Sequence, residues 1–427
     1  MEPVARPLVT RRTFLAGTAL SGVAAFLAAC GTSPSPSPAG SASAAPSSSS
    51  AAASASPSTG SPPPGSPTPG SPTPHPTVTP APSPVDELAR RIAGLLIVGF
   101  RGERLADAAW VKTAIHRDGL GGVILFDRDQ LTGRARNIVS VAQVAALTAD
   151  HRAAAGANGL MIGVDQEGGI VTRLGPAHGF PALASQADVG AGTVAAARTW
   201  ARTLAGSVSD AGCNLDFAPV LDLNVNPSSP AIGALHRSFS ADPAVVVRLA
   251  GLELDALHAR GIRSAAKHFP GIGSSSVNTD FGVADVTKTW SRTELEPYRQ
   301  LAAAGKLDAV MVGHVVNGQI DEARPASLSL ATIDSVLRGD IGFAGAVVTD
   351  DMQAAAITQR YGADEAILLA LEAGNDLLLF ANQQVYSTGL VAHVVKVVLG
   401  AVAHGRLTAA QIDAKWARRQ ALLGLSG

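Results

Sequence analysis

The sequence predicts an α/β protein: a single (β/α)8 barrel of the TIM type, preceded by a disordered tether. Eight short apolar runs recur between residues 84 and 427, and stretches with helical periodicity separate them. The runs are continuous rather than alternating, as in strands that a parallel sheet buries on both faces. Polar side chains of chemical interest follow the runs, at the barrel end where active sites lie.

The predicted strands are Leu95–Phe100, Gly122–Phe126, Leu160–Val164, Asn214–Ala218, Arg263–Lys267, Ala309–Gly313, Ala346–Thr349 and Asp376–Phe380. The helical segments between them include Val194–Ala211, Pro243–Arg260, Arg292–Ala304 and Asp364–Ala373. A doubly wound open sheet is the alternative fold. It would carry a Gly-rich phosphate-binding turn after the first strand, and the segment 100–103 (Phe-Arg-Gly-Glu) is not such a turn.

Residues 1–30 are typical of an export signal. The segment Arg11–Leu15 is a twin-arginine start, and small apolar residues lead to Leu27–Cys30, which resembles a lipobox. We expect Cys30 to be acylated and to anchor the exported protein on the outer face of the cytoplasmic membrane. The alternative is a membrane-spanning helix, but the apolar stretch Phe14–Ala29 is shorter than the ~20 residues that a bilayer requires.

Residues 31–83 consist almost entirely of Ser, Pro, Ala, Gly and Thr. So few apolar side chains cannot offset the entropy of ordering, which predicts a disordered linker before a globular domain at 84–427. The formal net charge is −1 and no basic cluster occurs, so nucleic-acid binding has no support. Cys213 has no disulfide partner once Cys30 is acylated. We expect the protein to be a monomer.

The side chains that follow the predicted strands form a pattern. They are Asp165, Glu167, Asp216, Asp222, His268, His314, Asp350 and Asp351. Asp350 ends a buried strand, where a carboxylate is well placed as a nucleophile or metal ligand. Alternatively, Asp350 or Asp351 caps the helix that follows. No H-x-H or H-E-x-x-H spacing supports a metal site.

Basic side chains accompany these carboxylates. Asp165 and Arg173 would orient a polyol through charge-assisted hydrogen bonds, or would simply pair with each other. Arg237 lies in a long connection, where a lone Arg is usually solvated. Lys267 ends a buried strand and must find a carboxylate or a ligand, because an unpaired buried charge is costly. We expect His314 to support the site rather than to react.

Together these segments resemble glycoside hydrolase family 3, in particular the single-domain bacterial β-N-acetylhexosaminidases that remove N-acetylglucosamine. The resemblance runs from about Leu88 to the C-terminus. Its motifs are I-G-V-D-Q-E-G-G at 162–169, L-D-F-A-P-V-L-D at 215–222, H-R-S-F at 236–239, K-H-F-P-G at 267–271, P-A-S-L-S at 325–329 and G-F-A-G-A-V-V-T-D-D-M at 342–352.

The resemblance implies an exo-acting, retaining glycosidase that needs no cofactor or metal and acts on terminal β-linked sugars of cell-wall-type saccharides. Asp350 would be the nucleophile of a double displacement. The residues that would bind the hydroxyls of the terminal sugar are Asp165, Arg173, Arg237, Lys267 and His268. A β-glucosidase-like specificity and a non-catalytic saccharide-binding lipoprotein are the alternatives.

The chain departs from the family in the loop after K-H-F-P-G. The hexosaminidases carry an Asp-x-His dyad there as acid/base, and the corresponding residues here are Asn278–Asp280. Ile272 stands where the family has His, and Ile170 stands where an Arg usually follows Gly-Gly.

Three alternatives follow for the acid/base. Asp280 takes the role, with a pKa raised by burial or by the nearby nucleophile. Asp285 or Glu167 takes it instead. In the third alternative, the protein binds sugars and catalyses poorly.

Overall fold

The structure is a computed structural model that describes residues 83–425. The expected signal peptide with Cys30, and the expected linker up to residue 82, lie outside the described residues. Among residues 83–425, no helix combines the length and the apolar character needed to cross a bilayer.

Eight parallel strands form the central sheet, and each pairs with the next one along the chain. They are β1 (Leu96–Gly99), β2 (Gly122–Leu125), β3 (Met161–Val164), β6 (Leu215–Asp216), β7 (Arg263–Phe269), β8 (Ala309–Val312), β11 (Ala346–Thr349) and β12 (Leu378–Phe380). Strand β12 pairs with β1, and a parallel bridge joins Val348 of β11 to Leu377 beside β12. The sheet therefore closes, which confirms the barrel and rules out the open doubly wound sheet.

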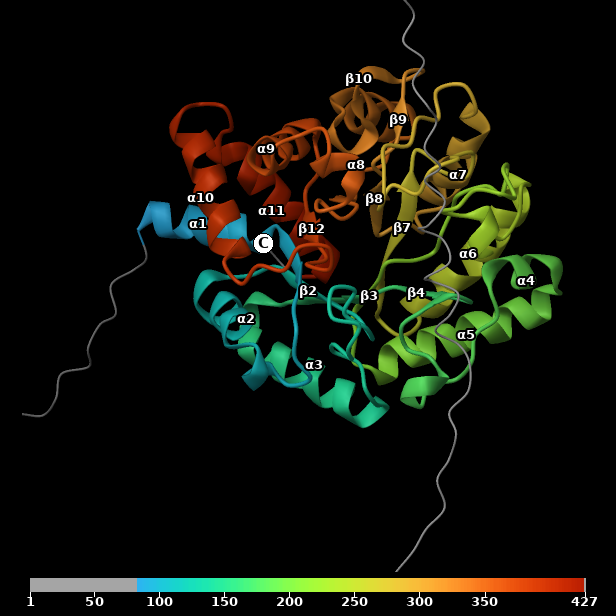
Figure 1. Cartoon of the computed structure of the whole chain (residues 1–427), viewed down its shortest axis with the longest axis horizontal. Coiled ribbons are helices and arrows are strands. Elements are labelled where there is room, and N and C mark those ends of the chain that lie inside the picture. Colours follow the sequence, from blue (N-terminus) through green and yellow to red (C-terminus); the bar gives the residue numbers. More distant parts are fainter. Residues whose placement is uncertain (1–82, 426–427) are drawn as a thin grey trace, which may run out of the picture. The chain divides into compact units, whose positions relative to one another are not determined.

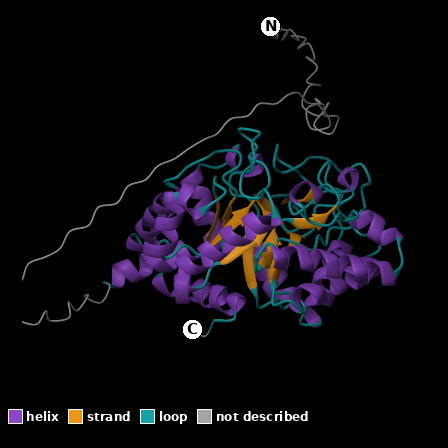
Figure 2. Cartoon of the chain, turned by 90° about the horizontal axis from the view of Figure 1, so that it is seen from below, coloured by secondary structure: helices purple, strands orange, loops and turns teal. Residues whose placement is uncertain are grey.

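Helices surround the barrel, and many of the long loops gather at one end of it (Figures 1 and 2). The helices are α1 (Pro84–Gly94), α2 (Ala109–Thr113), α3 (Val141–Ala155), α4 (Gln186–Ala191), α5 (Val194–Asp210), α6 (Pro243–His258), α7 (Glu296–Ala303), α8 (Ala355–Thr358), α9 (Ala363–Ala373), α10 (Leu390–Ala403) and α11 (Ala409–Leu423). Four of them match the predicted helical segments to within a few residues. A 3₁₀ turn at Arg292–Leu295 precedes α7, and a π-helical segment at Ala331–Asp340 follows β8.

Two short antiparallel hairpins interrupt the βα alternation. Strands β4 (Gln166–Gly168) and β5 (Val171–Thr172) form one directly after β3. Strands β9 (Val316–Asn317) and β10 (Asp321–Pro325) form the other after β8. Both hairpins follow a barrel strand, so they extend the end of the barrel that carries the predicted site.

The barrel interior is filled by side chains. In β8, Ala309 and Met311 belong to the inner cluster, whereas Val310 and Val312 pack with the surrounding helices, as the two-residue period of a strand requires. Phe217 also lies in the inner cluster, and a Cβ on Gly163 would come within 2.5 Å of its ring. The polar groups at the C-terminal ends of the strands therefore lie above an apolar core.

Candidate active site

The β4–β5 hairpin turns the Glu167 side chain back into the barrel. Gly168 and Gly169 adopt φ of +87° and +64°, a left-handed conformation that other residues rarely adopt. A Cβ on Gly168 would also lie 2.4 Å from the Ala184 carbonyl. The hairpin conformation thus depends on both glycines, and the carboxylate of Glu167 is buried as a result.

Glu167 lies between two cations. Its Oε1 is 2.8 Å from Lys267 Nζ, and Arg237 reaches both of its oxygens from Nε and Nη2 at 2.7 and 2.8 Å. Lys267 Nζ also donates to Asp165 Oδ1 at 2.7 Å. The expectation that Arg237 is solvated is therefore wrong, and so is the alternative that Asp165 pairs with Arg173. We call these four residues, Asp165, Glu167, Arg237 and Lys267, the charged cluster.

Electrostatics hold Lys267 and Glu167 of the charged cluster in their ionised forms. Burial alone would lower the pKa of Lys267, but the charges of Asp165 and Glu167 outweigh it and raise this pKa to about 12. Burial alone would raise the pKa of Glu167, but Arg237 and Lys267 bring it below its usual range. Each buried charge is thus compensated by a close partner.

His268 is oriented by Asp222. The Asp222 Oδ2 lies 2.7 Å from His268 Nδ1 and accepts from the His268 backbone N–H at 3.2 Å. The other ring nitrogen, Nε2, lies 3.5 Å from Arg237 Nη2, so His268 also contacts the charged cluster. The other oxygen of Asp222 accepts from the backbone N–H of Ile272 at 2.7 Å. Asp222 therefore fixes both His268 and the start of the following loop.

Asp350 lies at the mouth of β11, partly accessible to solvent. Its Oδ1 accepts from the Asp351 backbone N–H at 2.8 Å, and its backbone N–H donates to the Val312 carbonyl. Helix α8 begins at Ala355 with Ala354 as its N-cap, so neither Asp350 nor Asp351 caps a helix. The carboxylate of Asp350 is therefore free for another role.

The pKa of Asp350 is held below its usual range. Burial would raise it, but the nearby His268 and His314 and the Asp351 N–H together lower it. His314 is fully buried, its pKa is itself lowered by burial, and its Nε2 donates to the Asp351 carbonyl at 2.8 Å. Asp350 is ionised at neutral pH, as a nucleophile must be.

The loop that follows β7, residues 271–283, bears Asp280 and is called the β7 loop. Two backbone N–H groups that follow Asp350 in the chain hold this loop: Ala355 donates to the Asp280 carbonyl at 3.3 Å, and Ala356 donates to the Thr279 carbonyl at 3.1 Å. Asn278 Oδ1 accepts from the Asp280 N–H at 2.9 Å. The β7 loop is thus seated directly beside the strand end that carries Asp350.

The pKa of Asp280 is shifted in the opposite direction to that of Asp350. Burial, and then the negative charge of Asp350, raise the pKa of Asp280 to about 6. The two carboxyls are therefore close enough to influence each other, one ionised and one poised to hold a proton. Such a divergence is the pattern expected of a nucleophile and an acid/base.

The other two candidates for the acid/base are in unsuitable settings. Both oxygens of Glu167 are bound by Lys267 and Arg237, and its pKa is lowered, so it does not hold a proton. Asp285 is exposed, accepts from the Thr287 N–H at 2.9 Å, and has a pKa lowered by the hydrogen bonds with Thr287. Of the three carboxyls that the sequence offers for this role, Asp280 is the one whose pKa is raised.

Arg173 lies apart from the charged cluster. Its Nη1 is 3.7 Å from Asp127 Oδ1, and its guanidinium packs 5.5 Å from the Phe126 ring centroid. Arg173 Nε and Asp127 Oδ1 are buried and have no hydrogen-bond partner among the residues that the structure describes. Sequence reasoning missed Asp127. Its position directly after a barrel strand was the signal that would have found it.

The family positions that differ in this chain are filled by apolar side chains. Ile272 is buried beside the site and contributes only its backbone N–H, whereas Ile170 is exposed at the tip of the β4–β5 hairpin. Among residues 83–425, no group of three or more His, Cys, Asp or Glu side chains has an arrangement that would hold a metal ion.

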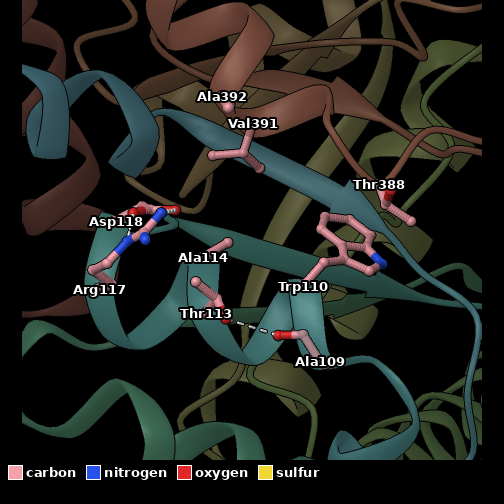
Figure 3. Close-up of a pocket in the computed structure, with 9 residues that line it drawn as sticks. All are labelled: Ala109, Trp110, Thr113, Ala114, Arg117, Asp118, Thr388, Val391 and Ala392. Atoms are coloured by element: carbon pink, nitrogen blue, oxygen red, sulfur yellow. Dashed lines mark hydrogen bonds and ion pairs between the residues drawn. The ribbon is translucent and has the colours of Figure 1, made fainter.

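A separate cavity of about 310 Å³ lies between α2 and the start of α10 (Figure 3). Its lining residues are Ala109, Trp110, Thr113, Ala114, Arg117, Asp118, Thr388, Val391 and Ala392. The charged pair in this lining, Arg117 and Asp118, is joined by a 2.7 Å contact and lies at the surface. The cavity contains none of the predicted site residues, so the carboxyl pair defines the candidate active site.

The sequence matches the family described as "Glycosyl hydrolase family 3 N terminal domain" over residues 87–422. A protein named "Beta-hexosaminidase" from Xanthomonas euvesicatoria pv. vesicatoria is 35% identical over 308 residues, which cover 70% of this chain and 86% of the relative. Among solved structures, the β-N-acetylhexosaminidase from Beutenbergia cavernae has a TM-score of 0.71 and 29% identity, with 79% of this chain and 98% of that chain covered.

A family 3 β-N-acetylglucosaminidase from Paenibacillus sp. str. FPU-7 also has a TM-score of 0.71, with 32% identity over 80% of this chain. The match covers 64% of the Paenibacillus chain, less than two thirds of its length. The expected resemblance is confirmed by the family match, the sequence relatives and the barrel. This chain belongs to glycosyl hydrolase family 3.

Proposed function

We propose that this glycoside hydrolase removes terminal β-linked N-acetylglucosamine from saccharides, with retention of configuration. The observation that carries the proposal is the pair Asp350 and Asp280, whose pKa values are shifted in opposite directions at one end of the barrel. The substrate class is supported by the similar proteins from Xanthomonas and Beutenbergia, named as hexosaminidases.

In the first step, Asp350 attacks the anomeric carbon and the bond to the leaving oxygen breaks. Asp280 gives its proton to that oxygen, so the alcohol leaves neutral. The covalent ester removes the negative charge of Asp350, which had raised the pKa of Asp280. The pKa of Asp280 therefore falls, and Asp280 stays ionised after it has given up its proton. It can then take a proton from the attacking water, whose oxygen bonds to the anomeric carbon as the bond to Asp350 breaks.

The terminal sugar would be held by the charged cluster together with His268 and Arg173. Lys267 Nζ has three protons and uses two of them on Asp165 and Glu167, which leaves one for a hydroxyl. These groups are already paired and oriented, so binding a sugar requires little rearrangement.

The test is turnover of nitrophenyl N-acetyl-β-glucosaminide and nitrophenyl β-glucoside by the parent protein and four variants. Asp350→Asn should lose activity, and Asp280→Gly should lose activity that azide restores as a glycosyl azide. Asp285→Asn and Glu103→Gln serve as controls with exposed carboxyls, and both should retain full activity. Full activity in Asp350→Asn would refute the mechanism.

The comparison of the two sugars decides the specificity. Faster turnover of the glucoside would favour the β-glucosidase-like alternative. Binding of N-acetylglucosamine without turnover, unchanged in Asp350→Asn, would instead show a saccharide-binding protein.

We further propose that the protein is exported, acylated on Cys30, monomeric, and active on cell-wall saccharides such as peptidoglycan fragments. The twin-arginine segment and the lipobox-like ending support the anchor. Cys30→Ala should move the protein from the membrane fraction to the soluble fraction and abolish labelling by a palmitate analogue. Light scattering of the purified protein tests the monomer.

A further inference from the structure

Two large apolar side chains are exposed beside the carboxyl pair. Phe281 follows Asp280 in the β7 loop and is 66% exposed. Val385 is 58% exposed and lies in the loop 381–389 between β12 and α10, called the β12 loop. A single exposed apolar residue needs no explanation, but two beside a catalytic acid raise the question of what covers them.

Hydrogen bonds bring the β7 and β12 loops together at Asp280. The Asp280 carbonyl accepts from Gln384 Nε2 at 3.1 Å, and Gln384 is the residue before Val385. The Val385 carbonyl in turn accepts from Gln353 Nε2 at 3.0 Å, three residues after Asp350. The two exposed side chains therefore stand on neighbouring loops that are tied to the acid/base and to the nucleophile strand.

The chemistry of the proposed function says which part of a substrate meets this surface. An acid that protonates the glycosidic oxygen must face the leaving group, because that oxygen links the departing alcohol to the sugar. The residue that follows such an acid in the chain is thus close to the leaving group rather than to the terminal sugar held by the charged cluster.

We propose that Phe281 and Val385 form an apolar subsite for the leaving group, with Phe281 as the residue that sets its specificity. The occupant is an alcohol with an aromatic ring or with the apolar face of a second sugar ring. This inference rests on the proposed function, since it uses Asp280 as the acid/base. It predicts that the protein prefers ring-bearing leaving groups and acceptors over small alcohols of equal reactivity.

The test is competition between two acceptors for the glycosyl-enzyme, with ethanol and 2-phenylethanol as the probes. In both cases the C–O bond to Asp350 breaks, the alcohol oxygen bonds to the anomeric carbon, and the alcohol proton passes to Asp280. Both acceptors present a primary hydroxyl and need the same base, so a disturbed Asp280 affects both transfers and cancels in their ratio. The ratio therefore reports the subsite alone.

The parent protein should favour transfer to 2-phenylethanol. Phe281→Ser should lower the ratio by about tenfold, as expected from loss of a ring contact, while Phe281→Tyr should keep it. Val85→Ser is the matched control, because Val85 is 64% exposed on α1, outside the strand-end loops. An unchanged ratio in Phe281→Ser, with normal hydrolysis, would overturn the subsite. Absence of any turnover by the parent protein would overturn the proposed function, and the subsite with it.

Discussion

The opposite pKa shifts of the carboxyl pair predict the pH dependence of catalysis. Activity requires Asp350 ionised and Asp280 protonated, so kcat/KM should be highest between the two pKa values. The pKa of Asp350 is below its usual range, and that of Asp280 is about 6. Above pH 6 the protonated fraction of Asp280 falls, and at pH 7 roughly a tenth of it is left. We therefore expect kcat/KM at pH 7 to be about tenfold below its maximum.

The assay is kcat/KM for N,N′-diacetylchitobiose from pH 4 to 9, because a sugar alcohol leaves only with a proton. Asp280→Asn should lower the maximum by roughly 10²- to 10⁴-fold and should abolish the decline above pH 6. A decline that persists unchanged in Asp280→Asn would refute the assignment. A midpoint near pH 7 that Asp351→Asn removes would transfer the role to Asp351, whose pKa is raised to about 7 by burial.

Three further predictions concern residues around the site. Glu294 is buried, and burial followed by the charge of Asp222 raises its pKa to about 8, so the free energy of unfolding should fall as pH rises from about 4.5 to 8. Glu294→Gln should remove this loss, which is about 3 kcal/mol at pH 7 and is measured by urea unfolding. Lys267→Met should destabilise the fold by about 3–5 kcal/mol and weaken sugar binding, whereas Lys415→Met, at another buried lysine, should destabilise it with KM unchanged. Asn278→Asp should place a third negative charge near Asp280, raise the pKa of Asp280 and shift the decline of kcat/KM to higher pH. A decline at the same pH as in the parent protein would contradict the placement of Asn278.

Hydrophobic periodicity predicted the strands of the barrel, and the polar residues at the strand ends predicted the place of the site. A continuous apolar run such as Val347–Thr349 is sufficient to predict a buried strand, because a parallel barrel buries both faces. Active-site residues of such a barrel lie at the C-terminal ends of its strands, and this rule selects Asp350 and Lys267 from the sequence alone. The same rule, applied to every strand, also covers Asp127.

The sequence alone could not predict which charged side chains of the site contact one another. Lys267 and Glu167 are 100 residues apart, and their contact depends on the register of the barrel and on the hairpin that turns at Gly168 and Gly169. Asp222 contacts the backbone N–H and Nδ1 of His268 and the backbone N–H of Ile272, and these three contacts depend on the path of the loop after β7. No local pattern encodes such geometry. The sequence offered Asp280 as the acid/base with Asp285 or Glu167 as the alternative, and the surroundings of these carboxyls separate them.

The two polar replacements in the β7 loop are physically linked. In the hexosaminidases that the sequence resembles, an Asp-x-His dyad is the acid/base. In the proposed mechanism the proton carrier is a carboxyl, Asp280, and the charge of Asp350 already raises its pKa. A carboxylate at position 278 would add a third negative charge to this site, whereas Asn278 shapes the same turn through its amide oxygen and adds none. A charge at position 278 would raise the pKa of Asp280 further, so the neutral Asn278 keeps this pKa close to the value of about 6 that burial and Asp350 set. Position 278 therefore influences the pH at which Asp280 loses its proton.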